Sequence, residues 1–152
     1  MEPVLSAAQP STTPGVIPTF SADGGFGDFD FIVVSNRLAV DRVVDEHGAS
    51  AWRRSPGGLV TALAPVMAKA DGAWVGWHGA PDETLEPFDE ANMRLVPVPL
   101  SAEEVELYYE GFSNATLWPL YHDVIASPEF HRTWWDSYRR VNERFAEATA
   151  SV

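Results

Sequence analysis

The chain has 152 residues, 45% of them hydrophobic and 12% aromatic, which is enough for one domain with a packed core. Its formal net charge of −12 makes nucleic acid and anionic membranes poor partners, because an acidic surface repels phosphate groups. The sequence contains no cysteine, which excludes disulfides, thiolate catalysis and cysteine-based zinc sites.

The chain starts with a segment that alternates proline with serine, threonine and alanine and ends in glycines. Such a composition buries too little apolar surface to offset its ordering entropy, so we predict a disordered tail at 1–27 and one folded unit at 28–152. The start of the chain lacks the pattern of a secretory signal, and no run reaches the roughly 20 apolar residues of a membrane span. We therefore expect a cytoplasmic protein without a membrane partner.

The folded unit is expected to begin with strands. Residues 31–34 are a β-branched apolar run without alternation, which predicts a strand buried on both faces of a parallel sheet. Residues 40–44 and 49–53 are predicted to pair as a small hairpin. Two more strands are predicted, a buried one at 74–77 and an alternating one at 93–98.

An apolar helix is predicted between the hairpin and the later strands, over 59–70, opened by Gly57 and Gly58. Apolar residues three and four positions apart predict the face of this helix that is buried. The positions on that face are Leu59, Leu63, Val66 and Ala70. Residues 82–92 are predicted to form an acidic loop.

Helices are predicted to fill the last third of the chain. Ser101 and Glu104 form a capping box, in which each side chain satisfies the other's backbone donor at a helix start. We expect this helix to end near Gly111 and a short second helix to run through Trp118. A long helix is predicted over 127–148. Its apolar stripe consists of Phe130, Trp134, Val141, Phe145 and Ala148.

This order of elements predicts the α/β fold class, with a Rossmann-like sheet and helices packed on it. A complete doubly wound sheet needs more strands than the sequence contains, so we expect an incomplete domain.

A first candidate site combines Arg37, at the end of the first predicted strand, with Gly57 and Gly58 at the start of the first helix. Glycine lets backbone N–H groups approach a ligand, a helix N-terminus carries partial positive charge, and a guanidinium can fork onto phosphate. The spacing matches neither the dinucleotide fingerprint nor the P-loop. On the pattern alone, a plain turn with a surface arginine explains these residues equally well.

A second candidate is the segment 108–122, which interleaves aromatic rings with hydroxyl and amide groups. Sugars bind such surfaces by stacking and hydrogen bonding, although aromatics buried between two helices are the simpler interpretation. Trp77 fits either a pocket floor or the core. The histidines lack metal-ligand spacing, and there is no serine elbow, so we predict no catalytic residue, no metal site and no cofactor.

Four segments resemble, in the same order, those of the trehalose-6-phosphate synthases, the retaining glycosyltransferase family 20, and the actinobacterial members most closely. These segments are 31–38 (FIVVSNRL), 55–63 (SPGGLVTAL), 74–77 (WVGW) and 108–122 (YYEGFSNATLWPLYH). The likeness also includes Trp134 and Trp135 and the run 141–146, and it covers residues 29–148.

The resemblance implies the acceptor-side part of a two-domain GT-B enzyme. This family transfers glucose from UDP-glucose, or another nucleoside-diphosphate glucose, to glucose 6-phosphate, giving trehalose 6-phosphate without a protein nucleophile. By resemblance, Arg37 holds the acceptor phosphate, and Trp118 helps to select the α anomer. The site residues implied are Arg37, Tyr109 and Trp118 on the acceptor side, Gly57 and Gly58 on the donor side, and Trp77 in support.

The sequence departs from the family in two ways. Ala39 stands where the family usually has proline, which alters loop stiffness more than chemistry. The family's acceptor-binding aspartate, its active-site histidine and the basic pair that grips the diphosphate lie beyond Val152, so we expect little or no transferase activity from this chain alone. The alternatives are a non-catalytic sugar-phosphate-binding or regulatory fragment and a glucosylglycerol-phosphate synthase. We expect the full-length enzyme to be a homo-oligomer.

Overall fold

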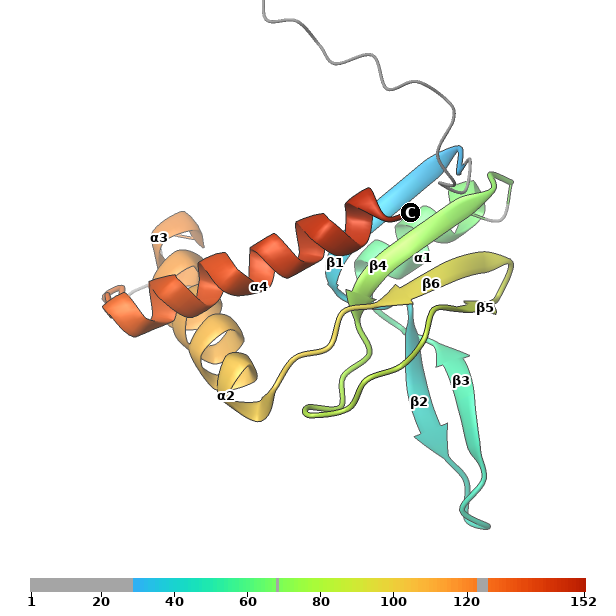
Figure 1. The fold of residues 1–152 in the computed structure, drawn as a ribbon, viewed down its shortest axis with the longest axis horizontal. Coiled ribbons are helices and arrows are strands. Elements are labelled where there is room, and N and C mark those ends of the chain that lie inside the picture. The colour runs from blue at the N-terminus through green and yellow to red at the C-terminus, as the bar shows by residue number, and fades with distance from the viewer. Residues whose placement is uncertain (1–28, 68, 123–125) are drawn as a thin grey trace, which may run out of the picture.

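The computed structural model describes residues 29–67, 69–122 and 126–152 (Figure 1). The tail predicted at 1–27 lies outside the described residues. Across the part that is described, no helix is both long enough and apolar enough to cross a membrane.

Four strands of the described chain form a mixed sheet in the order β1-β4-β6-β5. Strands β1 (Phe31–Arg37), β4 (Gly72–Trp77) and β6 (Met93–Pro97) are parallel, as predicted. The short strand β5 (Phe88–Glu90) pairs antiparallel with β6. Strand β5 was not predicted, because two of its three residues are acidic and the sequence around them was assigned to an acidic loop.

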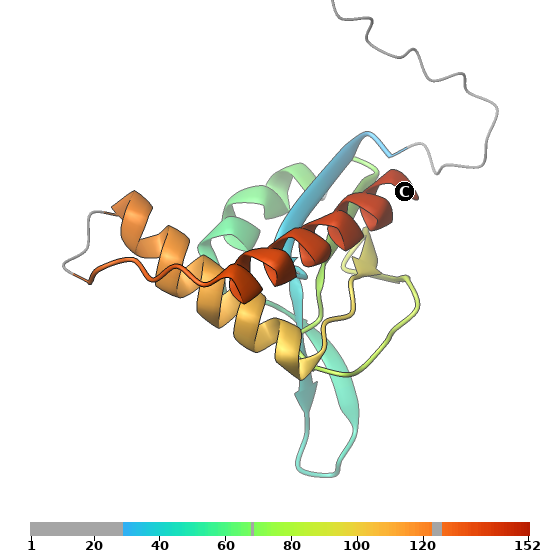
Figure 2. The same ribbon diagram turned by 60° about the vertical axis from the view of Figure 1, so that its left-hand side comes forward.

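The predicted hairpin is confirmed. Strand β2 (Val40–Val44) pairs antiparallel with β3 (Ser50–Arg54), and Val40 lies opposite Arg54. Gly48, in the connecting turn, has a φ of 79°, which glycine adopts without strain. The hairpin projects away from the sheet in both views (Figures 1 and 2).

The prediction that β1 is buried on both faces was wrong. Val33 packs into the core, whereas Ile32 and Val34 are 39% and 49% exposed. Val33 belongs to the apolar cluster that also contains Val60 of the first helix. The cluster on the opposite side is built from β4, β6 and the later helices, so the alternate side chains of β1 lie outside it.

Helix α1 (Gly58–Met67) begins at the glycine pair, as predicted, but buries a different face. Val60 and Met67 are buried and Leu63 packs beside them, whereas Leu59 and Val66 are about half exposed. The segment is apolar on most sides, so periodicity alone did not decide which row of side chains faces the sheet.

The capping box is confirmed. Ser101 Oγ accepts a hydrogen bond from the Glu104 amide at 3.1 Å, and Glu104 Oε2 accepts one from the Ser101 amide at 3.0 Å. Helix α2 (Ala102–Glu104) continues directly into the π-helix η1 (Val105–Leu117) and then into α3 (Trp118–His122). The predicted break near Gly111 is therefore wrong.

The last helix, α4 (Arg132–Ala150), starts five residues later than predicted, and residues 127–130 belong to no helix or strand. Val141 and Phe145 are buried against the sheet, which confirms that part of the stripe. Phe130 lies outside the helix and is 72% exposed, so its place in the stripe was wrong. Figure 2 shows α4 lying across the α2–η1–α3 segment.

A partly buried ion pair joins the start of this helical segment to α4. Arg144 donates to both carboxylate oxygens of Glu104, at 2.7 and 2.9 Å, and also to the Pro99 carbonyl at 2.7 Å. The hydrogen bonds from Arg144 hold the pKa of Glu104 below its ordinary value, although burial acts the other way.

Glu104→Gln is expected to lower the free energy of unfolding at pH 7 by about 1 kcal/mol, because the partly exposed pair is screened by solvent. Since the folded pKa is depressed, the contribution is present above the ordinary glutamate pKa of about 4.3 and is lost as pH falls through the folded pKa. Urea unfolding at pH 7 and pH 3 measures both effects. Exposed Glu103→Gln is the control, and equal pH dependence of the two variants would contradict the prediction.

Candidate functional site

The carboxyl ends of β1 and β4 bring Arg37 and Trp77 together. Each is the last residue of its strand, and the two are paired in the parallel register. The guanidinium carbon of Arg37 lies 5.2 Å from the centre of the Trp77 ring, a cation–π distance. In open α/β sheets, ligands bind in the crevice beyond this end of the strands.

Glycine is required on the other side of the Arg37 side chain. Gly79 has a φ of 100°, which L side chains rarely adopt. A Cβ added there would collide with the terminal nitrogen of Arg37 and would lie 2.7 Å from its guanidinium carbon. The cation is therefore held between an indole face and a glycine backbone.

The guanidinium remains open to solvent. Its side chain is 46% exposed, and one nitrogen donates to Asp41 Oδ1 at 3.0 Å. Asp41 lies on β2, at the base of the hairpin. A forked guanidinium carries five N–H donors, so this single bond leaves donors free for an anionic ligand.

A second charged group lies beside Arg37. Arg42 of β2 donates to both carboxylate oxygens of Glu83, at 2.5 and 3.3 Å. His78 is 3% exposed, its Nε2 lies 3.6 Å from Glu83 Oε2, and neither ring nitrogen has a hydrogen-bond partner among the described residues. Burial lowers the pKa of His78, Arg42 and Arg37 act in the same direction, and Glu83 opposes them.

A cavity of about 190 Å³ opens between these groups. Its lining consists of Arg37, Asp41, Arg42, His78, Gly79 and Ala80. Neither His78 nor Arg42 was among the site residues predicted from the sequence. The sequence position of His78 could have indicated a site, because this residue directly follows the carboxyl end of a buried parallel strand.

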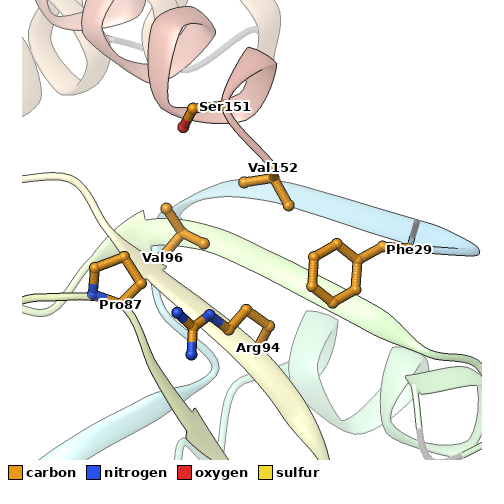
Figure 3. A pocket seen from close by; sticks show the side chains of 6 residues that line it. All are labelled: Phe29, Pro87, Arg94, Val96, Ser151 and Val152. Atoms are coloured by element: carbon orange, nitrogen blue, oxygen red, sulfur yellow. The ribbon is translucent and has the colours of Figure 1, made fainter. Parts of the chain in front are cut away.

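A different cavity lies at the opposite end of the sheet (Figure 3). It has a volume of about 260 Å³ and is lined by residues that include Phe29, Arg94 and Val152. Arg94 is already paired with Asp89 at 3.3 Å. This end holds the amino ends of β1 and β6, so we assign the candidate site to the Arg37 end.

The glycine pair forms the amino end of α1, as the phosphate hypothesis requires. Both glycines are exposed, and a Cβ at Gly58 would have no heavy atom within 4 Å. The Gly57 carbonyl accepts the first helical hydrogen bond, from the Thr61 amide at 3.0 Å. The backbone at this turn is therefore accessible, and its contact with a donor stays a prediction.

The two acceptor-side aromatics lie on the helical segment. Tyr109 is half-buried against the core cluster that includes Trp77. Its neighbour Tyr108 donates to Asn36 Oδ1 at 3.1 Å, which ties η1 to the residue before Arg37. Burial raises the pKa of Tyr108 to about 12, so its hydroxyl stays a donor at neutral pH.

Trp118 lies farther along, as the first residue of α3, and α3 forms the outer end of the helical segment in both views (Figures 1 and 2). It is 55% exposed and stacks on the His122 ring with centres 3.5 Å apart. Arg37 thus contacts Trp77 directly, and the neighbouring residue Asn36 accepts a hydrogen bond from Tyr108 of η1. That Trp118 and the glycine pair meet the same ligand stays a prediction.

The family model described as "Glycosyltransferase family 20" matches residues 29–152. The chain belongs to this family. Trehalose-6-phosphate synthase of Mycobacterium sp. (strain KMS) is 58% identical over 126 residues, which cover 83% of this chain and 26% of that protein. The chain therefore spans about a quarter of the length of the curated relatives it matches.

Solved structures agree with the family and confirm the predicted α/β fold class. The alpha,alpha-trehalose-phosphate synthase (UDP-forming) from Burkholderia vietnamiensis is 33% identical, with a TM-score of 0.61, over 79% of this chain and 25% of that chain. The corresponding Burkholderia xenovorans synthase, solved in complex with glucose-6-phosphate, is 27% identical with a TM-score of 0.58, also over 79% of this chain and 25% of that chain.

Gly79→Ala tests the packing around Arg37. The positive φ costs about 1 kcal/mol for an L side chain, and the clash is expected to add about 0.5–1.5 kcal/mol, because the guanidinium is the exposed end of a flexible side chain and can move to another rotamer. Gly48→Ala is the matched control, since Gly48 also has a positive φ but a Cβ there would have no heavy atom within 4 Å. Urea unfolding of both variants measures the difference. Equal losses would show that displacing Arg37 from Gly79 costs no measurable stability.

Proposed function

We propose that this chain is the acceptor-binding part of a trehalose-6-phosphate synthase, which transfers glucose from UDP-glucose, or another nucleoside-diphosphate glucose, to glucose 6-phosphate. The names of the relatives support the reaction. The observation that carries the proposal is the exposed Arg37 guanidinium at the carboxyl ends of β1 and β4, held by Trp77 and Gly79. The proposed setting is the cytoplasm, with a homo-oligomeric full-length enzyme and no nucleic-acid or membrane partner.

In this proposal Arg37 binds the phosphate of glucose 6-phosphate. Its free N–H donors form charge-assisted hydrogen bonds with phosphate oxygens, and its packing on Trp77 fixes their direction at little entropic cost. Tyr109 and Trp118 shape the pocket for the sugar ring, because aromatic faces stack on the apolar faces of sugars. Trp118 also helps to select the α anomer of the acceptor.

The donor binds at the amino end of α1. The accessible backbone of Gly57 and Gly58 faces its diphosphate and the transferred glucose, and the partial positive charge of the helix end favours those groups. No catalytic residue is assigned within this chain. Because the cations that stabilise the leaving diphosphate are expected outside these 152 residues, the chain alone is proposed to have little or no transferase activity.

Arg37→Gln is expected to weaken glucose 6-phosphate binding at least tenfold, equivalent to about 1.4 kcal/mol, because the cation with free N–H donors is removed, whereas the neighbouring Arg42 is already bonded to both oxygens of Glu83. Isothermal calorimetry on the chain measures the affinity. Arg139→Gln, on the exposed side of α4, is the matched control. Binding that is unchanged in Arg37→Gln would overturn the assignment of Arg37.

The same calorimetry separates the alternatives. Glucose without phosphate is expected to bind far more weakly than glucose 6-phosphate. Tighter binding of glycerol 3-phosphate would favour the glucosylglycerol-phosphate alternative. Robust trehalose 6-phosphate formation by the chain would contradict its proposed inactivity.

Asp41→Asn is expected to strengthen glucose 6-phosphate binding about two- to fivefold, since the Asp41 carboxylate competes with phosphate for Arg37 and repels it. The increase is expected to shrink in high salt, which screens the exposed carboxylate. Calorimetric titrations in low and high salt measure both effects. Weaker binding by Asp41→Asn would show instead that Asp41 orients Arg37 for its ligand.

A further inference from the structure

The π-helix η1 is unusually long. It runs for 13 residues, whereas π-helices are mostly single turns and are frequent at functional sites. At its end, the Trp118 amide donates to the Ser113 carbonyl, five residues back. The Ser113 hydroxyl donates to the Tyr108 carbonyl at 2.9 Å, again five residues back.

Pro119 explains why the α register is disfavoured at the end of η1. In an α-helix the proline ring would clash with the Ala115 carbonyl and could not donate to it. Here the Glu129 amide donates to the Ala115 carbonyl at 2.9 Å, and the Thr116 hydroxyl donates to the Glu129 carbonyl. The segment before α4 thus replaces the hydrogen bond that proline removes.

Gly111 explains how this segment packs on α4. A Cβ added at Gly111 would lie 2.7–2.9 Å from three atoms of the Trp134 indole, closer than real Cβ atoms come. One residue on, Phe112 packs on Tyr138 with ring centres 4.7 Å apart. Only glycine permits this approach of the two helices without a shift.

The buried side of η1 has its positions three and five residues apart, an average of four. Tyr108, Gly111 and Thr116 are its buried positions. Hydrogen bonds to the fifth residue back place residues four and five apart on the same side of a helix. Spacings of four and then five separate Tyr109, Ser113 and Trp118, so the π register places these three residues on one side of η1. In an α-helix, nine residues make about two and a half turns, so Tyr109 and Trp118 would lie on opposite sides.

We propose that the π register of η1 places Tyr109 and Trp118 on one face, and that Gly111 and Pro119 are positioning residues for that face. The identification of glucose 6-phosphate as the ligand of this face rests on the proposed function, whereas the helical register of η1 does not depend on it. The hydrogen bond from Tyr108 to Asn36 holds the first turn of η1 near Arg37. The helical register then decides whether Trp118 lies on the same side of the helix as Tyr109, which is next to Tyr108.

NMR on the labelled chain tests the register directly. A scalar coupling across the hydrogen bond is expected between the Trp118 amide nitrogen and the Ser113 carbonyl carbon. Coupling to the Asn114 carbonyl instead would mean an α register and would overturn the proposal, whether or not a ligand binds. Coupling to Ser113 without any binding of glucose 6-phosphate would uphold the register and overturn the proposed function.

Variants test the positioning role. Gly111→Ala is expected to weaken glucose 6-phosphate binding at least tenfold. In an NMR titration with glucose 6-phosphate, the chemical shifts of the Tyr109 ring and the Trp118 indole are then expected no longer to change together. Adding Trp134→Leu, which removes the atoms in the clash, is expected to restore affinity to within about threefold. Pro119→Ala returns the missing N–H and is expected to weaken the Trp118–Ser113 coupling.

Two variants at exposed positions serve as controls. Glu106→Ala, on the exposed side of the same helix, and Pro87→Ala, in an exposed loop, are expected to change neither affinity nor coupling. Wild-type affinity in a folded Gly111→Ala would refute the positioning role of Gly111. A folded double variant that stays as weak as Gly111→Ala would refute the role of the Gly111–Trp134 contact.

Discussion

The position of the Arg37 guanidinium is the constraint on which the candidate site depends. The parallel pairing of β1 with β4 brings Arg37 beside Trp77, and the turn after β4 places Gly79 under the cation. The indole attracts the charge, and the glycine provides the space that any other residue would fill. A long side chain that would otherwise sample many rotamers is thereby pre-organised, which lowers the entropic cost of binding an anion.

The charge around this cation is nearly balanced before any ligand arrives. Asp41 pairs with Arg37, and Glu83 pairs with Arg42. The buried His78 has a lowered pKa and therefore stays largely neutral near pH 7, so it adds little repulsion. The two arginines can lie at one cavity because each has its own carboxylate. The phosphate proposed to bind here would compete with Asp41, which is partly exposed and has one bond to Arg37, rather than with Glu83, which accepts two bonds from Arg42.

Local chemistry made much of the fold predictable. The β-branched run at 31–34, the hairpin and the capping box at Ser101 each depend on residues close in sequence, and the structure contains all three. Burial was less predictable, because it depends on distant partners. The alternate side chains of β1 and the buried row of α1 are decided by which elements cover them, and their own periodicity carries no such information.

The positions of Gly111 and Pro119 in one continuous helical segment show where sequence rules reach their limit. Each residue is a helix breaker by local rules, so two short helices with a gap are the natural prediction. In the structure the Trp134 ring occupies the space that a side chain at 111 would need, and the Glu129 amide supplies the bond that Pro119 cannot. Both compensations come from the segment around α4, 23 residues after Gly111 and 10 residues after Pro119. The same two residues therefore do not break the helix but set its register, and only the tertiary contact with α4 distinguishes these outcomes.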